Sequence, residues 1–214
     1  MTGQTCVVVD YGSGNVYSVL HALKRIGVDA YLTSSHTAIA GASRVILPGV
    51  GAFGDVMTKL RETGLDEAVV RHIEAERPFL GICVGMQVLM ETGKEFGDHA
   101  GLGVVPGTVE RVPEAVPGLP PMRVPIIGWH PVQPSEGSDW ADTPFPQEAR
   151  TPFYYFVHSY SVRPADPGHL CGEIAVEGRA IAAALRKDNV FGVQFHPERS
   201  AGEGQRFLQR FMAF

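Results

Sequence analysis

The first half of the chain alternates short apolar runs with segments of helical periodicity, and this alternation constrains the fold most strongly. The apolar runs that predict strands are 5–10, 28–33, 44–49 and 79–82. Segments 15–27 and 53–76 carry apolar residues at helical spacing, and the second predicts one helix or two helices broken near Gly64. Gly27 stands where a C-terminal cap of the first helix belongs. Strands separated by helices predict right-handed βαβ units and a parallel sheet.

The second half has a different pattern. From about residue 102 to 195 it shows short strand-like runs with almost no helical periodicity, which predicts antiparallel strands added to one side of the sheet. The Pro-rich segments 113–121 and 131–152 predict surface loops, the second of them either solvated or in contact with a partner. A helix is expected over 204–214. The predicted fold is therefore α/β, an open and mostly parallel sheet with flanking helices and additional antiparallel strands, in a single domain over 1–214.

Composition excludes several classes of protein. The chain is 44% hydrophobic and 19% charged, as expected of a soluble globular domain, and its net charge of −5 without a Lys/Arg run argues against a nucleic-acid or membrane partner. We expect neither a signal peptide nor a membrane-spanning helix. Three widely spaced cysteines, Cys6, Cys83 and Cys171, do not suggest a disulfide framework, and a cytoplasmic location is expected.

The sequence "GICVGM" places Cys83 between two glycines, where a predicted strand meets a helix-forming stretch. Gly-x-nucleophile-x-Gly at such a join is the nucleophile-elbow pattern, in which Gly81 and Gly85 avoid a collision across the turn. The turn would expose the thiol at the carboxyl edge of the sheet and direct the amide of Val84 toward it, while the helix N-terminus would favour a thiolate and an oxyanion. On this pentapeptide alone, a buried structural cysteine is an equal alternative.

A second motif, "FGVQFHPERS", brings His196 and Glu198 to the end of a predicted strand. The proline between them disfavours a helical conformation for His196, and in an extended chain side chains two residues apart point the same way. The carboxylate could then orient the imidazole as the third member of a nucleophile–base–orienter set. Taken alone, the motif would more often be a surface turn. A zinc site is disfavoured because no Pro-Cys-x-x-Cys follows, so no metal is predicted.

Two glycine-rich stretches complete the candidate motifs. "LPGVGAFGD" (47–55) ends a predicted strand with a loop whose backbone N–H groups, around Gly49 to Gly51, could supply a second oxyanion donor beside Cys83. "DYGSGNVYS" resembles a dinucleotide fingerprint only weakly, because Tyr17 stands where that pattern needs glycine.

The stretches "LPGVGAFGD", "GICVGMQ", "YFVHSY" and "GVQFHPERS" occur in an order and spacing that resemble the class I (triad) glutamine amidotransferases. The likeness runs from "DYGSGN" to the final helix. Within the family the chain is similar to the glutaminase subunit of imidazole glycerol phosphate synthase, because Met86 and Gln87 follow the elbow. Relatives that serve anthranilate or GMP synthesis usually have histidine at the position of Met86.

The resemblance implies a mechanism for three side chains and three backbone groups. Cys83 would attack the side-chain amide of glutamine, His196 would act as base and then as acid, and Glu198 would orient His196. A thioester would form and be hydrolysed to glutamate. The oxyanion-hole donors implied by the family are the backbone groups of Val84, Val50 and Gly51.

The resemblance also implies substrate contacts and a partner. The residues expected to bind glutamine are Gln87, His158, Ser159 and Tyr160. No cofactor is implied, and ammonia would pass to a separate cyclase subunit in a heterodimer that makes imidazole glycerol phosphate and AICAR in histidine biosynthesis. His130 and Arg199 stand where the family often has Asn and Lys, at positions near the cyclase, and an arginine keeps the charge of a lysine but not its geometry.

Two other hypotheses are kept open. One is a glutaminase with another partner, for example in anthranilate or pyridoxal phosphate synthesis, and Met86 argues against anthranilate. The other is a catalytically silent regulatory subunit on the same scaffold, against which the intact Cys83, His196 and Glu198 argue.

Overall fold

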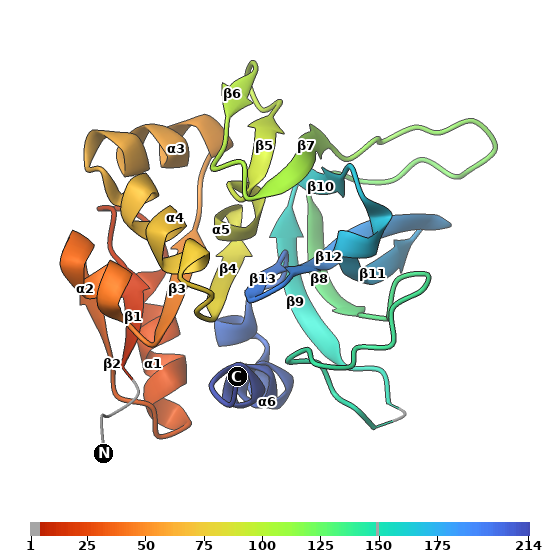
Figure 1. Cartoon of the computed structure of the whole chain (residues 1–214). Helices are drawn as coiled ribbons and strands as arrows, with labels where there is room; N and C mark the ends of the chain where they lie inside the picture. Colours follow the sequence, from red (N-terminus) through yellow and green to blue (C-terminus); the bar gives the residue numbers. More distant parts are fainter. Residues whose placement is uncertain (1–4, 149) are drawn as a thin grey trace.

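The computed structural model describes residues 5–148 and 150–214 (Figure 1). Its main sheet has seven strands in the order β11-β12-β13-β4-β3-β1-β2. Five strands pair in parallel, namely β1 (Cys6–Val9), β2 (Ala30–Thr33), β3 (Arg44–Gly49), β4 (Phe79–Cys83) and β13 (Val190–Val193). The strands β12 (Arg179–Lys187) and β11 (Leu170–Val176) extend the sheet in antiparallel fashion beyond β13. The expected α/β sheet is confirmed.

The described residues contain six α-helices, which flank this sheet. They are α1 (Val16–Arg25), α2 (His36–Gly41), α3 (Phe53–Glu62), α4 (Leu65–Glu74), α5 (Val84–Gln87) and α6 (Ala201–Phe211). Helix α1 contacts α6, whereas α2 contacts α4. Gly64 separates α3 from α4 with a positive φ of 66°, so the two-helix alternative for 53–76 is the correct one. Gly27, with φ 79°, follows α1 as expected of a cap.

Helix α2 was not expected, because its six residues are too few to show a helical period. Its first turn is closed locally: the Ser35 side chain accepts a hydrogen bond from the N–H of Ala38, which is the usual N-cap arrangement. Ile39 is the buried residue of this helix and anchors it to the core.

The prediction that all strands of the second half extend one side of the main sheet is wrong in part. Only β11, β12 and β13 do so. Strands β7 and β10 join the earlier strands β5 and β6 in a four-stranded sheet, β10-β7-β5-β6, while β8 and β9 form a two-stranded sheet. Their bounds are β5 (Met90–Gly93), β6 (His99–Ala100), β7 (Val105–Arg111), β8 (Ile126–Pro131), β9 (Phe153–His158) and β10 (Tyr160–Pro164). Because β3 and β13 flank β4 on its two sides, the strands that follow β4 in the chain are not its neighbours in the sheet.

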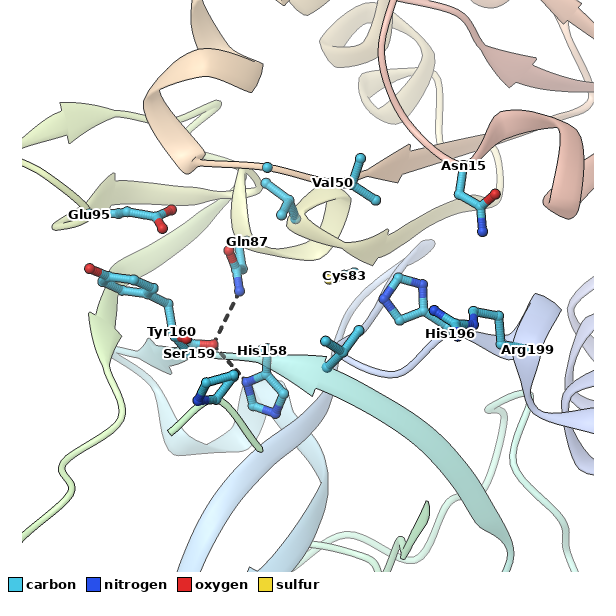
Figure 2. Close-up of a pocket in the computed structure, with 14 residues that line it drawn as sticks. Asn15, Val50, Cys83, Gln87, Glu95, His158, Ser159, Tyr160, His196 and Arg199 are labelled. Atoms are coloured by element: carbon cyan, nitrogen blue, oxygen red, sulfur yellow. Dashed lines mark hydrogen bonds between the residues drawn. The ribbon is translucent and has the colours of Figure 1, made fainter. Parts of the chain in front are cut away.

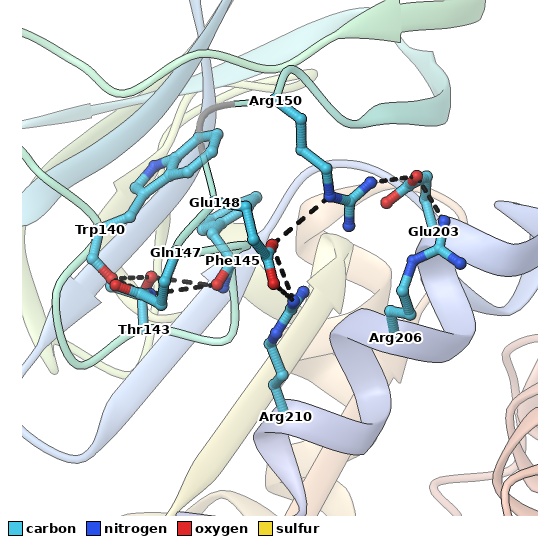
Figure 3. A network of polar contacts seen from close by, with 9 residues as sticks. All are labelled: Trp140, Thr143, Phe145, Gln147, Glu148, Arg150, Glu203, Arg206 and Arg210. Carbon is cyan, nitrogen blue, oxygen red and sulfur yellow. Dashed lines mark hydrogen bonds and ion pairs between the residues drawn. The ribbon is translucent and has the colours of Figure 1, made fainter.

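The segment 131–152 is also more than a surface loop. Trp140 and Phe145 are buried, and their rings stack with centroids 4.4 Å apart. Phe145 also contacts Phe207 of α6, at 5.2 Å between centroids. Outside this aromatic contact, Arg150 pairs with Glu203 of α6 (Figure 3). Isolated aromatic residues in a polar, Pro-rich stretch therefore hold the segment against the core.

The strand ends locate the candidate site. In the parallel register Gly49, the last residue of β3, lies opposite Cys83, the last residue of β4. On the other side of β4, Val193 ends β13 beside Ile82. The carboxyl ends of three neighbouring strands thus meet at one edge, the usual place for a ligand in an α/β sheet.

The buried apolar side chains of the described residues form one cluster. The assignment of a single domain to 1–214 stays a prediction. Within the described residues, no helix combines the length and the apolar character needed to cross a membrane.

Candidate active site

Cys83 occupies a strained turn between β4 and α5. Its backbone has φ 55° and ψ −113°, a conformation that residues with a side chain rarely adopt and that is typical of functional sites. A Cβ added to Gly81 would overlap the carbonyl oxygen of Gly85, as the elbow motif predicts. A Cβ added to Gly85 would instead overlap the carbonyl oxygen of Leu47 on β3. Gly85 is therefore required by the neighbouring strand, which corrects the expectation of a collision across the turn.

The helix that follows the elbow is a single turn, Val84–Gln87, and β5 begins at Met90. One turn carries only a few aligned peptide dipoles, so its macrodipole is a weaker source of thiolate stabilisation than the sequence suggested. The groups that immediately surround Cys83 therefore matter more than the helix as a whole. Gln87 lies one turn after Cys83, as expected.

His196 and Glu198 form a hydrogen-bonded pair, with 2.8 Å between Nδ1 and Oε1. Both side chains are buried, at 5% and 1% exposure. His196 is extended, but Glu198 lies in the 3₁₀ turn η2 (Pro197–Arg199). The predicted pair is therefore present, although it forms across a turn and not along an extended chain. The Nδ1 of His196 is hydrogen-bonded to the Glu198 carboxylate. Its Nε2 has no hydrogen-bond partner in the described part of the chain and is available to the adjacent Cys83 thiol (Figure 2).

The electrostatics of His196 follow from these neighbours. Burial lowers the pKa of its imidazole, but contacts with Cys83 and Glu198 outweigh burial and raise the pKa to about 10. The cause is that both partners stabilise the charged imidazolium. A sulfur, an imidazole and a carboxylate in sequence are the parts that nucleophilic catalysis requires.

A cavity of about 660 Å³ opens over Cys83 (Figure 2). This volume is in the range of small-molecule sites. All the predicted site residues except Glu198 line it, and Glu198 is held behind His196. The full lining is Asn15, Val50, Gly51, Cys83, Val84, Gln87, Glu95, Pro125, Val157, His158, Ser159, Tyr160, His196 and Arg199.

The loop after β3 brings Val50 and Gly51 to this cavity together with Val84. Gly51 has a φ of 98°, which only glycine adopts freely, and Val50 is partly exposed. Gly49 has no room for a side chain because an added Cβ would meet the backbone of Val84 and Gly85. The loop and the elbow are thus in backbone contact, as an oxyanion hole shared between them requires.

Gln87 and His158 converge on one carbonyl group. The Nε2 of Gln87 donates to the oxygen of Tyr160 at 3.2 Å, and the Nδ1 of His158 donates to the same oxygen at 2.9 Å (Figure 2). Burial lowers the pKa of His158 to about 4, so its imidazole is neutral near pH 7. The segment His158–Tyr160 therefore acts on the site partly through its backbone.

Two further residues contact the predicted ones and a third lines the cavity with them, and the sequence reasoning does not identify any of the three. Gln194 is fully buried and its Nε2 lies 3.6 Å from the Cys83 sulfur. Asn15 donates to Oε1 of Glu198 at 3.3 Å. Glu95 lines the cavity and accepts a hydrogen bond from a backbone N–H at 2.8 Å.

The sequence carried a signal for two of these residues. Gln194 is two positions before His196, so the strand alternation already placed both on one side. Asn15 belongs to "DYGSGN", a stretch that resembles a nucleotide motif only weakly and at which the likeness to the amidotransferase family begins. No local pattern distinguishes Glu95. Within 5–148 and 150–214, no group of three or more His, Cys, Asp or Glu side chains is arranged to hold a metal ion.

Comparisons with known proteins identify the family. The family model for class I glutamine amidotransferases matches residues 7–213. The subunit HisH of imidazole glycerol phosphate synthase from Rhodopirellula baltica is 44% identical over 95% of each chain. The HisH subunit from Salinibacter ruber is 40% identical, over 96% of this chain and 93% of the relative.

Solved structures show the same fold. The PurLQS structure from Thermotoga maritima superposes with a TM-score of 0.71 at 23% identity, and covers 100% of this chain and 99% of that one. A structure described as a glutamine amidotransferase also has a TM-score of 0.71, at 22% identity and 97% coverage of both chains. The chain belongs to the class I glutamine amidotransferases, in the branch of the HisH subunits of imidazole glycerol phosphate synthase.

Proposed function

We propose that this chain is the glutaminase subunit of imidazole glycerol phosphate synthase. It hydrolyses glutamine to glutamate and ammonia, and a cyclase subunit uses the ammonia to make imidazole glycerol phosphate and AICAR in histidine biosynthesis. The observation that carries the proposal is Cys83 on a strained elbow, beside a His196 imidazole that Glu198 holds at 2.8 Å. The membership of the HisH branch supports the choice of pathway. We place the enzyme in the cytoplasm, consistent with its three free cysteines.

The first half-reaction forms a thioester. The Cys83 thiolate attacks the carboxamide carbon of glutamine and gives a tetrahedral oxyanion. The protonated His196 then delivers its Nε2 proton to the amide nitrogen, the C–N bond breaks, and ammonia leaves. Glu198 keeps the imidazole in the tautomer and orientation that this transfer needs.

The second half-reaction hydrolyses the thioester. Neutral His196 removes a proton from water, the hydroxide attacks the acyl carbon, and the C–S bond breaks to release glutamate and regenerate the thiolate. Backbone N–H groups of Val84 and of the loop residues Val50 and Gly51 stabilise both oxyanions, since these residues line the cavity beside Cys83. One donor of this kind contributes about 3 kcal/mol to transition-state stability.

Recognition of glutamine uses acceptors for its ammonium group. Glu95 supplies a carboxylate in the cavity. The side-chain oxygen of Gln87 is a second acceptor, because its nitrogen is already bonded to the Tyr160 and Gln194 oxygens. His158, Ser159 and Tyr160 complete the wall of the cavity on the other side.

The partner binds at the outer face of the β8–β9 ribbon. Ile127, Trp129 and Phe153 are 59%, 49% and 48% exposed, and register places them on one face of the ribbon. Val157, opposite Ile127 in the same register, lines the cavity, so this apolar face borders the site. An exposed apolar face of this kind is typical of a protein interface.

The two departures from the family pattern differ in their positions. The Arg199 guanidinium stacks on Tyr155 at 4.4 Å, next to Trp129 in the proposed interface. His130 points to the other face of the ribbon, where its ring packs against Phe156 at 5.8 Å. The change at 199 therefore alters the interface itself, whereas the change at 130 lies behind it.

The test is glutamate release by the purified complex of this chain with its cyclase and the cyclase's nucleotide ligand. A Cys83→Ala variant should lose activity by several orders of magnitude, while Cys171→Ala, which removes a buried cysteine outside the site, should keep it. Full activity of the Cys83→Ala complex would overturn the proposal. Activation by an anthranilate synthase component in place of the cyclase would overturn the choice of partner.

A further inference from the structure

Gln194 occupies a position between the nucleophile and a proposed substrate contact. It follows β13 directly, and its backbone N–H donates to the Ala183 oxygen at 2.8 Å. Its side chain is fully buried. The Oε1 atom accepts a hydrogen bond from Nε2 of Gln87 at 3.0 Å, and Nε2 lies 3.6 Å from the sulfur of Cys83.

The orientation of this amide is determined by its partners. The Gln87 nitrogen also donates to the Tyr160 carbonyl, which can only accept, so Gln87 cannot be turned around without losing that bond. Gln87 therefore donates an N–H to Gln194, and Gln194 must accept this hydrogen bond with its side-chain oxygen. The nitrogen of Gln194 is left facing the sulfur. The two amides form a directed chain of donors that ends on Cys83, and such chains polarise one another.

We propose that Gln194 is a catalytic residue that stabilises the Cys83 thiolate by donating a hydrogen bond to its sulfur, and that it holds the Gln87 oxygen toward the substrate. The proposal rests on the proposed function of the site. A hydrogen bond to an anionic sulfur is stronger than one to a neutral sulfur, so Gln194 raises the thiolate fraction of the resting enzyme. When the thioester forms, the charge leaves the sulfur and this bond weakens.

Two substitutions separate the two roles of the amide. Gln194→Met keeps the approximate length but removes both the donor to sulfur and the acceptor for Gln87. Gln194→Glu keeps an oxygen for Gln87 and replaces the donor with a negative charge against the thiolate. Gln205→Met on α6, outside the cavity lining, is the matched control.

The decisive measurement is the pH dependence of Cys83 alkylation by iodoacetamide in the full-length chain bound to its cyclase, followed by mass spectrometry of the Cys83 peptide. Burial raises the pKa of both Cys6 and Cys171 to about 12, so these thiols should react little. The midpoint should move up by about one pH unit in Gln194→Met, a roughly tenfold loss of rate at neutral pH, and further in Gln194→Glu. The control should keep the wild-type midpoint.

Steady-state kinetics test the second role. Gln194→Met should raise the KM for glutamine as well as lower kcat, whereas Gln194→Glu should lower kcat with a smaller change in KM. An unchanged alkylation midpoint in a folded Gln194→Glu or Gln194→Met variant would overturn the donor role, and equal KM changes in both would overturn the role in holding Gln87. Alkylation needs no substrate. Failure of the proposed function, seen as a wild-type complex that releases no glutamate, is therefore a separate outcome.

Discussion

The backbone strain at Cys83 leads to a quantitative prediction about stability. With φ 55° and ψ −113°, Cys83 has a conformation that is the mirror image of an ordinary extended one. Glycine adopts it as easily as its mirror image, whereas a residue with a Cβ is strained by about 1–3 kcal/mol. Cys83→Gly and Cys83→Ala both remove the thiol and its interaction with His196. The difference between their free energies of unfolding therefore reports the backbone strain at this position.

The expected difference in the free energy of unfolding has two parts. Glycine gains the strain energy relieved in the folded state and loses the free energy that its extra conformational freedom gives the unfolded chain. Taking the strain as about 2 kcal/mol and the glycine penalty as about 0.5–1 kcal/mol leaves Cys83→Gly more stable than Cys83→Ala by about 1 kcal/mol. In a chain of this size that corresponds to a rise of about 2–4 °C in Tm. The measurement is urea unfolding of the two variants followed by circular dichroism, with equal m-values as a condition for comparison.

Cys171 offers the matched control, because it is a buried cysteine in β11 whose φ is not positive. There Cys171→Gly should be less stable than Cys171→Ala by about 0.5–1 kcal/mol, the ordinary penalty for glycine in a strand. The reasoning about the elbow is refuted if glycine is also the less stable residue at position 83. A difference of the same sign and size at both positions would mean that the strained turn stores no energy.

Three other predictions concern charge, positioning and the partner. Because the pKa of His196 is raised in the folded chain, the charged imidazole stabilises the fold fully below its ordinary pKa of 6.5, and this contribution is lost as the pH rises toward about 10. Cys83→Ala should lower the pKa of His196, which an NMR titration of the imidazole would measure. An unchanged pKa would contradict the pairing of Cys83 with His196. Asn15→Leu should lower kcat about tenfold by removing a hydrogen bond to the Glu198 carboxylate, with little effect on KM, and an unchanged kcat in the glutaminase assay would count against this role. Trp129→Ala should weaken cyclase binding by at least tenfold in calorimetry, with only a small fall in Tm, because about half of the side chain is exposed. Unaltered affinity would place the interface elsewhere.

Features that depend on a few neighbouring residues could be predicted well. The elbow at Cys83 is one, since the steric conflict at Gly81 arises within the turn itself. The break at Gly64 and the cap at Gly27 are others, because a positive φ is a property of a single residue. His196 and Glu198 belong here as well, being two residues apart, although the turn that joins them was not foreseen.

Features that depend on packing between distant segments could not be predicted. Gln87 and Gln194 are 107 positions apart, and nothing near either residue reveals the bond between them. The burial of Trp140 is similar, because its partner Phe145 is itself buried by rings from distant segments, Tyr154, Phe195 and Phe207. The distribution of the second-half strands among three sheets is likewise set by pairing between segments that are distant in the chain, such as β13 with β4.

The sequence by itself thus determined the class of fold and the family, and it predicted Cys83, His196 and Glu198 as the triad, since strand–helix alternation and short motifs act through local sterics and periodicity. The tertiary structure alone decided which groups contact the Cys83 sulfur and which contact the triad from further away. Asn15 contacts Glu198, and Gln194 contacts Cys83, because segments from opposite ends of the chain end at one edge of the sheet. Hydrogen bonds extend only about 3 Å, so their partners are set by how the strands are placed in space.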